Sequence, residues 1–143
     1  MLQPSTLAFF QELRVNNNKE WFDQNRKWYD LVKVDYLSLA GKLLEAMKPE
    51  DPTLEMQTAK DCIFRINRDV RFSKNKSPYK TNLGIALHPG GKKGSLAAYY
   101  LHIEEGQSFV GGGLWMPEAP SLSKVRKEIH YFYDDLEKIL KNP

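Results

Sequence analysis

The spacing of the apolar residues changes twice along this chain, and each change restricts the folds open to it. From Tyr29 to Leu43 apolar residues recur at steps of three and four, which is the period of an α-helix. Between Cys62 and Met116, four short stretches alternate apolar residues with polar residues or glycines, which is the period of a β-strand. After Pro120 the helical period returns. Helices, then strands, then a helix predict an α+β fold with helices packed on an antiparallel sheet.

Three helical regions are expected from the apolar period and from the residues that cap and break helices. They run from Pro4 to about Leu13, from Asn18 to about Met47, and onward from about Leu122. Because the apolar residues of the last region share one helix face, we expect that face to pack on the sheet. These residues are Leu122, Val125, Ile129, Phe132, Leu136 and Ile139.

Four strands are expected to form one mostly antiparallel sheet. They lie near Ile63–Arg68, Leu83–His88, Leu96–Glu104 and Phe109–Met116. A turn is expected over Pro89–Gly94, and the short connection between the third and fourth strands favours an antiparallel pair.

Length and composition set further limits. A chain of 143 residues suits one domain, so a single α+β domain is expected over residues 1–143. The single cysteine, Cys62, excludes a disulfide framework, and the three scattered histidines lack zinc-ligand spacing, so we expect no metal and no cofactor. No apolar leader precedes the first basic residue, Arg14, and the longest stretch without charge, Gly106–Pro117, is too short to span a bilayer. A cytoplasmic protein without a membrane segment is therefore expected.

The positive charge is concentrated in one segment. From Lys60 to Lys80 there are seven Lys and Arg against two Asp, a net charge of +5, although the whole chain carries only +3. A local positive field of this kind attracts anionic ligands. Alternation places Arg65 and Asn67 on one strand face and Arg68 on the other. We expect Arg65 to be the more buried arginine, because Ile63 shares its face.

Arginine and lysine beside hydroxyl and backbone donors are the groups that bind phosphate or carboxylate oxygens. The segment therefore predicts an anion-binding site. The alternative is that its arginines form internal ion pairs with Asp61, Asp69 or the acidic helices. The candidate ligand-binding residues are Arg65, Asn67, Arg68, Arg71, Lys74, Lys76, Tyr79 and Lys80.

Two further features are candidates for a site. Three consecutive glycines begin at Gly111, and glycine in a strand commonly marks a bulge or a close approach by another group. Gly112 and Gly113 are therefore candidate ligand contacts, and the alternative is an aromatic side chain packed over the bare backbone. The candidate acid–base groups are Asp69 and His102, the latter beside Tyr100 and Glu104 on one strand face, although a half-exposed surface histidine is the alternative.

The chain resembles a bacterial family known as domain of unknown function 2461. The resemblance is carried by Asn16–Phe22, by Phe64–Asn82 with its Arg-Asp, Phe-Ser and Ser-Pro-Tyr-Lys-Thr-Asn elements, by Gly111–Pro117 and by Leu122–Arg126. Members of the family continue past this point with another basic and aromatic segment, so the resemblance implies that the chain is truncated after Pro143. It implies no activity.

The leading functional hypothesis is a domain that binds a small phosphate-bearing ligand or a nucleic-acid backbone through the basic segment. An enzyme acting on a phosphorylated or carboxylated substrate is the first alternative, with Arg65 and Arg68 as clamps. A structural or protein-interaction module with internally paired arginines is the second.

Overall fold

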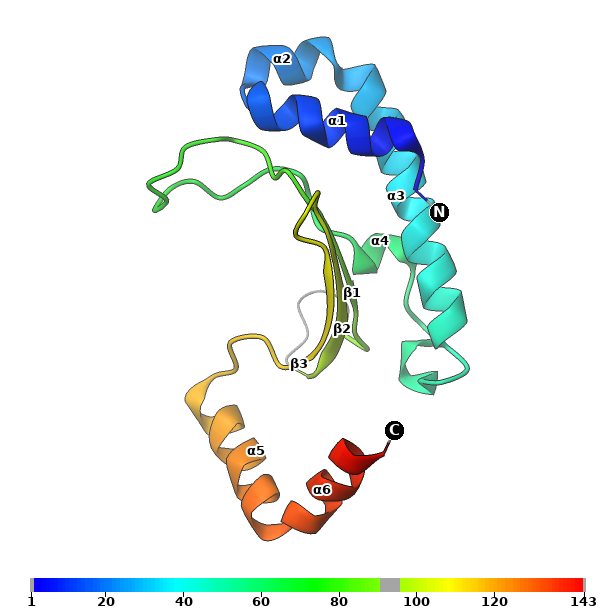
Figure 1. Ribbon diagram of the computed structural model, residues 1–143, viewed down its shortest axis with the longest axis vertical. Coiled ribbons are helices and arrows are strands. Elements are labelled where there is room, and N and C mark those ends of the chain that lie inside the picture. Colours follow the sequence, from blue (N-terminus) through cyan, green and yellow to red (C-terminus); the bar gives the residue numbers. More distant parts are fainter. Residues whose placement is uncertain (1, 91–95, 143) are drawn as a thin grey trace. The chain divides into compact units, whose positions relative to one another are not determined.

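Three helices form the N-terminal third of the chain in the computed structural model (Figure 1). The structure describes residues 2–90 and 96–142. Helix α1 (Pro4–Val15) begins with proline at its first position, where the missing N–H costs nothing. In α2 (Lys19–Gln24), the Asn18 side chain accepts from the backbone N–H of Trp21 at 2.9 Å and caps the helix. Helix α3 (Arg26–Met47) follows directly.

The helical region expected between Asn18 and Met47 is confirmed in extent but is interrupted at Asn25. This residue ends α2 and precedes α3 with φ −100° and ψ 18°, outside the helical region. Its side-chain amide donates to the carbonyl of Trp21 at 2.9 Å. The backbone N–H of Asn25 donates to the same carbonyl at 3.0 Å, so the side chain and the backbone share one acceptor at the break.

Three strands form the sheet, in the order β1-β2-β3, with antiparallel neighbours. Strand β1 is Leu83–Leu87, β2 is Ala98–Ile103 and β3 is Phe109–Gly113. Three of the four expected strands and their antiparallel arrangement are thus confirmed. The expected turn at Pro89–Gly94 lies mostly outside the described residues.

The fourth expected strand, Ile63–Arg68, is wrong. After the short elements η1 (Pro52–Leu54) and α4 (Ala59–Cys62), the chain makes isolated bridges only, from Ile63 to Ile85 and from Asn67 to Tyr79. Within residues 64–80 the backbone bonds run inside the loop, from the Arg68 N–H to the Pro78 carbonyl at 2.9 Å and from the Lys80 N–H to the Ile66 carbonyl at 2.8 Å. Because proline has no N–H to donate, this ladder cannot continue through Pro78.

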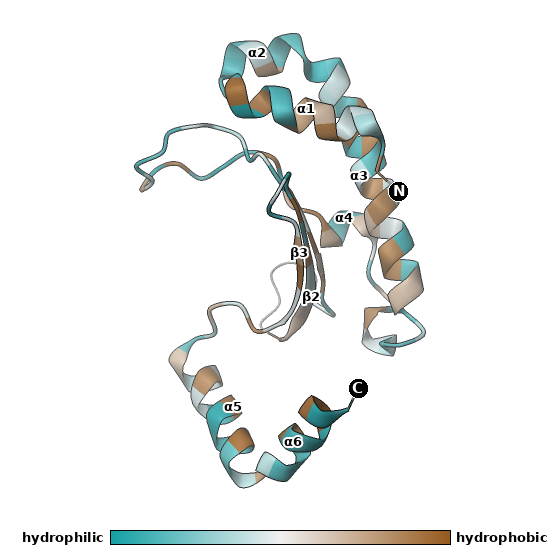
Figure 2. Ribbon diagram, in the orientation of Figure 1, coloured by the Kyte–Doolittle hydropathy of each residue, from teal (hydrophilic) through white to brown (hydrophobic). Residues whose placement is uncertain are grey.

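The core of residues 1–113 lies between the helices and β1. Phe9 is fully buried, and five aromatic rings lie around it, all with ring centroids within 6.3 Å. All five residues of β1 are buried. Figure 2 shows hydrophobic residues along the strands, and along α3 where they recur between hydrophilic ones. Burial of these apolar side chains is the main force that holds the helices on the sheet.

Tyr36 of α3 joins the helix layer to the edge of the sheet. Its hydroxyl donates to the carbonyl of Gly84, and it accepts from the N–H of Gly84 at 3.1 Å and from the N–H of Phe64 at 3.3 Å. Since β1 is an edge strand, its outward backbone groups need partners from outside the sheet. One buried hydroxyl therefore satisfies three backbone groups and fixes the start of the 64–80 loop.

This contact makes stability depend on pH in the alkaline range. Burial raises the pKa of Tyr36 to about 12 from the ordinary value of 10.0. A raised folded-state pKa favours the protonated form, so the contribution is complete below pH 10 and is lost as pH rises through 12. We expect the wild-type free energy of unfolding to fall by about 2–3 kcal/mol more than that of Tyr36→Phe over this range, in urea melts. Parallel curves for the two proteins would contradict this expectation.

Residues 114–143 form a second compact unit. It contains α5 (Ala119–Tyr131) and α6 (Tyr133–Lys141), separated at Phe132, where φ is −125° and ψ is 44°. The helix expected from about Leu122 is therefore two helices. None of the described residues of α5 and α6 is buried. The expected packing of their apolar face on the sheet, and the expectation of a single domain, stay predictions.

No helix in the described ranges has an apolar stretch long enough to cross a membrane.

Candidate anion-binding site

The strand register places small, aromatic and polar side chains together on one face of the sheet. Gly84, His102 and Phe109 lie opposite one another across the three strands, and Tyr100 lies opposite Gly111. Leu83, Ile85 and Leu101 point to the other face, toward the core. We call the face that carries Tyr100 and His102 the outer face.

A chain of polar contacts runs along the outer face of β2. The Tyr100 hydroxyl lies 3.1 Å from Nδ1 of His102, and Nε2 of His102 lies 3.2 Å from Oε2 of Glu104. In the tautomer with a proton on Nε2, His102 donates to Glu104 through Nε2 and accepts from the Tyr100 hydroxyl through Nδ1. The His102 ring also stacks on Phe109, with centroids 4.9 Å apart. The alternation of β2 thus produces the predicted grouping of Tyr100, His102 and Glu104.

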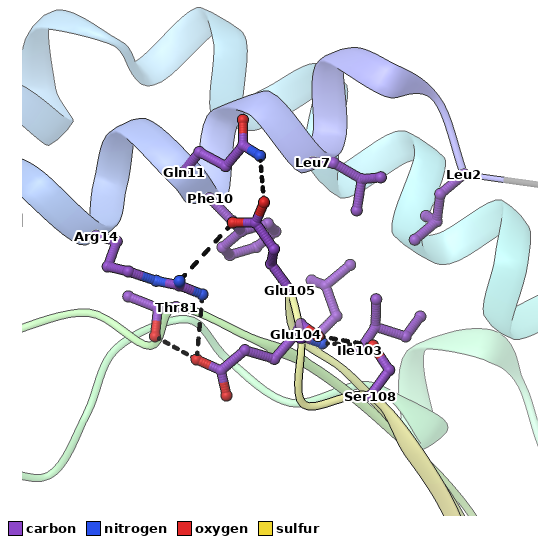
Figure 3. A pocket seen from close by; sticks show the side chains of 12 residues that line it. Leu2, Leu7, Phe10, Gln11, Arg14, Thr81, Ile103, Glu104, Glu105 and Ser108 are labelled. Carbon is purple, nitrogen blue, oxygen red and sulfur yellow. Dashed lines mark hydrogen bonds and ion pairs between the residues drawn. The ribbon is translucent and has the colours of Figure 1, made fainter.

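The second carboxylate oxygen of Glu104 also has polar partners (Figure 3). Its Oε1 accepts from the Thr81 hydroxyl at 3.1 Å and lies 3.7 Å from the Arg14 guanidinium. Arg14 also lies 3.8 Å from Glu105. These residues border a pocket of about 330 Å³ between α1 and the β2–β3 hairpin, whose apolar lining includes Phe10. Since Arg14 already faces two carboxylates, this pocket offers no free positive charge to an anion.

Three cations of the basic segment form hydrogen bonds or an ion pair within the 64–80 loop. Arg68 is half-buried and donates to the carbonyl of Ser77 at 3.0 Å. Arg71 makes two bonds to Asp69, at 2.9 and 2.7 Å, and these bonds hold the pKa of Asp69 below its ordinary value. Lys76 donates to the carbonyl of Val70 at 3.0 Å. The alternative of internally satisfied cations thus describes this part of the segment.

Arg65 and Lys80 have a different environment. Lys80 is half-buried, and its Nζ lies 5.2 Å from the centroid of the Phe64 ring. Burial, and then the positive charge of Arg65, lower the pKa of Lys80. Among the described residues, neither cation forms an ion pair with a carboxylate. The positive charge of Arg65 thus acts on the half-buried ammonium of Lys80, and it also contributes to the lowered pKa of Asp69. Lys74, also without an ion pair in residues 2–90 and 96–142, is exposed in the distal part of the loop.

The expectation that Arg65 is more buried than Arg68 is wrong. Arg65 is exposed and Arg68 is half-buried. The expectation assumed a strand with one covered face, whereas this stretch is a loop in which alternation does not determine burial.

The remaining candidates lie in different places. Tyr79 is a core residue that stacks on Phe22 with centroids 4.1 Å apart, while Asn17 bonds both backbone groups of Tyr79 at 3.0 Å. Asn67 is exposed. Gly112 points to the face opposite Gly111.

The alternative of an aromatic side chain over the glycines of Gly111–Gly113 does not describe these positions, and an aromatic side chain instead covers Gly84. Tyr100 covers Gly84, since a Cβ built there would lie 2.7 Å from the tyrosine hydroxyl. At Gly111 a Cβ would meet nothing within 4 Å, so the backbone lies open. Gly113 is equally open, but its φ of +138° restricts it to glycine.

Substitution of Gly84 and substitution of Gly111 are expected to have opposite effects on stability. In Gly84→Ala the new methyl group displaces Tyr100 from His102, and we expect a loss of about 1–3 kcal/mol in the free energy of unfolding. Gly111→Ala, on the same face, is expected to be neutral or stabilising by up to about 1 kcal/mol, because alanine lowers the entropy of the unfolded chain. Chemical denaturation of both variants checks this. Equal losses would show that Tyr100 does not rest on Gly84.

The catalytic candidates are separate. Asp69 is paired with Arg71 in the loop, His102 is part of the β2 chain, and no hydrogen bond or ion pair joins them in the part of the chain that is described. No group of three His, Cys, Asp or Glu within residues 2–90 and 96–142 is placed to hold a metal ion.

Sequence reasoning missed Phe64, Asn82 and Asn17 as site or scaffold residues. The amide nitrogen of Asn82 lies 3.1 and 3.2 Å from the two ring nitrogens of His102. Asn17 anchors the end of the loop through Tyr79. The available signal was their position in the stretches that carry the family resemblance, because no periodicity identifies them.

Comparison with known proteins gives a family but no further relatives. Neither the curated proteins nor the solved structures contain a match to this chain. Residues 5–143 match the family described as a conserved hypothetical protein (DUF2461). The match covers essentially the whole chain, so this protein belongs to the DUF2461 family.

Proposed function

We propose that this domain binds a phosphate-bearing anion beside the outer face of the sheet, with Lys80 and Arg65 as its cationic contacts. One observation carries the proposal: a half-buried ammonium lies near a second cation, and neither forms an ion pair in the described residues.

The energetics of this arrangement favour an external anion. A charge that is partly removed from water without a counter-ion raises the free energy of the folded state, and a like charge nearby raises it further. An anion between Lys80 and Arg65 would reverse both effects. The planar guanidinium of Arg65 suits two oxygens of one phosphate, and the compact ammonium of Lys80 suits a third.

A second candidate function rests on the series of polar contacts between Tyr100, His102 and Glu104 along β2. The order carboxylate, imidazole and hydroxyl in Glu104, His102 and Tyr100 is an arrangement in which a histidine can take a proton from a hydroxyl. It supports an enzyme that acts on a phosphorylated or carboxylated substrate. The anion site itself is required in both cases, so binding is the first property to test.

Lys80→Met tests the proposal, because methionine keeps the apolar stem and removes the charge. We expect wild-type protein to bind inorganic phosphate with a Kd near 1 mM, from two charged contacts of about 1.5–3 kcal/mol each. Lys80→Met should weaken this binding at least tenfold, measured by isothermal titration calorimetry. Its own melting temperature should be unchanged or higher, because an unpaired, half-buried charge is removed.

Lys27→Met is the matched control. Lys27 is an exposed lysine on α3, so its removal changes the net charge equally but should leave phosphate binding within twofold. Equal weakening in both variants would reduce the effect to general electrostatics. A lower melting temperature of Lys80→Met with unchanged phosphate binding would make Lys80 a structural residue and contradict the proposal.

A further inference from the structure

The outer face carries a row of aromatic rings that begins at the proposed anion site. Phe64, which contacts Lys80, lies 6.4 Å from Tyr100 at 74° between ring planes. Tyr100 lies 5.8 Å from Phe109, and Phe109 stacks on His102. Phe109 is 54% exposed. The rings therefore lead, one contact at a time, from the cations to an accessible phenyl group on β3.

An open stretch of backbone lies within this row. Gly111 shares the outer face with Phe109, two residues away on β3, and is paired with Tyr100 on β2. No atom lies within 4 Å of the position of a Cβ at Gly111. A flat group can thus lie on the backbone of Gly111, next to Tyr100 on the neighbouring strand and Phe109 on the same strand. At Gly84, on the same face, Tyr100 occupies the corresponding space.

From this arrangement we infer that the anion is a nucleoside phosphate whose base lies over the open backbone of Gly111, next to Tyr100 and against the exposed ring of Phe109. The inference rests on the proposed function, since Lys80 and Arg65 hold the phosphate. Aromatic side chains on an open sheet, flanked by cations, bind nucleotides because every base has a face that stacks. The ligand is either a free nucleotide or one unit of a single-stranded nucleic acid, because both present the same base and phosphate.

The test compares ligands that differ by the base alone. For wild-type protein we expect AMP to bind at least tenfold tighter than ribose 5-phosphate, in calorimetric titrations at one salt concentration. Gly111→Val fills the open space and should abolish this difference while leaving inorganic phosphate binding within twofold. Gly112→Val is the matched control: its side chain points to the opposite face, and it should retain the tenfold preference.

Phe109→Leu provides a second variant, which keeps an apolar side chain on the same strand and removes the ring. It should reduce the preference for AMP over ribose 5-phosphate to less than threefold. An oligothymidylate of ten nucleotides distinguishes the two kinds of ligand. Binding tenfold tighter than that of TMP indicates a single-stranded nucleic acid, and equal binding indicates a free nucleotide.

The titrations distinguish failure of the base-stacking inference from failure of the proposed anion site. If phosphate binds at Lys80 but AMP is no tighter than ribose 5-phosphate, the base-stacking inference is wrong and the anion site stands. If AMP is preferred equally by wild type and Gly111→Val, the base binds elsewhere and the inference is also wrong. If neither phosphate nor any nucleotide binds, the proposed function itself fails.

Discussion

Replacing Phe9 by alanine is expected to cost about 3–5 kcal/mol in the free energy of unfolding. Phe9 is fully buried, and its ring contacts Phe10 and Phe22 edge-on, at 5.5 and 6.3 Å between centroids. Removal of the ring leaves a cavity at the centre of the aromatic cluster, where helix packing allows little collapse. Since single domains are stable by only about 5–15 kcal/mol, a large share of the total would be lost.

Phe72→Ala is the matched control for this variant. The same ring is removed, but Phe72 is 96% exposed, so urea denaturation should show a change of less than about 0.5 kcal/mol. A loss at Phe9 no larger than that at Phe72 would mean that the aromatic cluster is not the centre of the core.

Removal of the Tyr36 hydroxyl is expected to have the second-largest effect. Tyr36→Phe leaves the backbone groups of Gly84 and the N–H of Phe64 without their partner. An unsatisfied buried polar group costs about 1–3 kcal/mol, and partial access of water to the sheet edge reduces the sum, so we expect a loss of about 2–4 kcal/mol at pH 7. Guanidinium denaturation measures it.

Tyr29→Phe is the control on the same helix. The half-buried Tyr29 hydroxyl has no hydrogen bond within the described residues, so its removal should change stability by less than about 0.5 kcal/mol. Indistinguishable losses for the two variants would show that the Tyr36 hydroxyl does not hold the sheet edge.

The parts of the fold that the sequence predicted correctly are those with a strong local signal. The strand ending at Ile103 and the strand beginning at Phe109 are joined by a short turn, in which Gly106 has the positive φ of 72° that favours glycine. The stretch Ile63–Arg68 alternates equally well but lies in a loop, because its backbone bonds depend on partners that local pattern does not reveal. Bridges to Ile85 and Tyr79 are the only trace of the expected pairing among the described residues.

In the candidate site, too, the sequence predicted the features with a local signal and not those that depend on tertiary contacts. Composition located the basic segment, and the alternative of internal ion pairs named Asp69, which pairs with Arg71 in the structure. Composition did not indicate which cations would be left without an ion pair, because that depends on the tertiary positions of Phe64, Tyr100 and the carboxylates. The placement of Lys80 against Phe64 is such a tertiary feature.

Binding of a phosphate-bearing anion by Lys80 and Arg65 can be followed residue by residue. The experiment is an NMR titration of ¹⁵N-labelled protein with inorganic phosphate. We expect the amide signals of Arg65, Lys80 and their neighbours to shift together and to saturate with one Kd near 1 mM, and we expect Lys80→Met to abolish these shifts. Shifts confined to residues 71–76, or no saturable shift at Arg65 and Lys80, would contradict it.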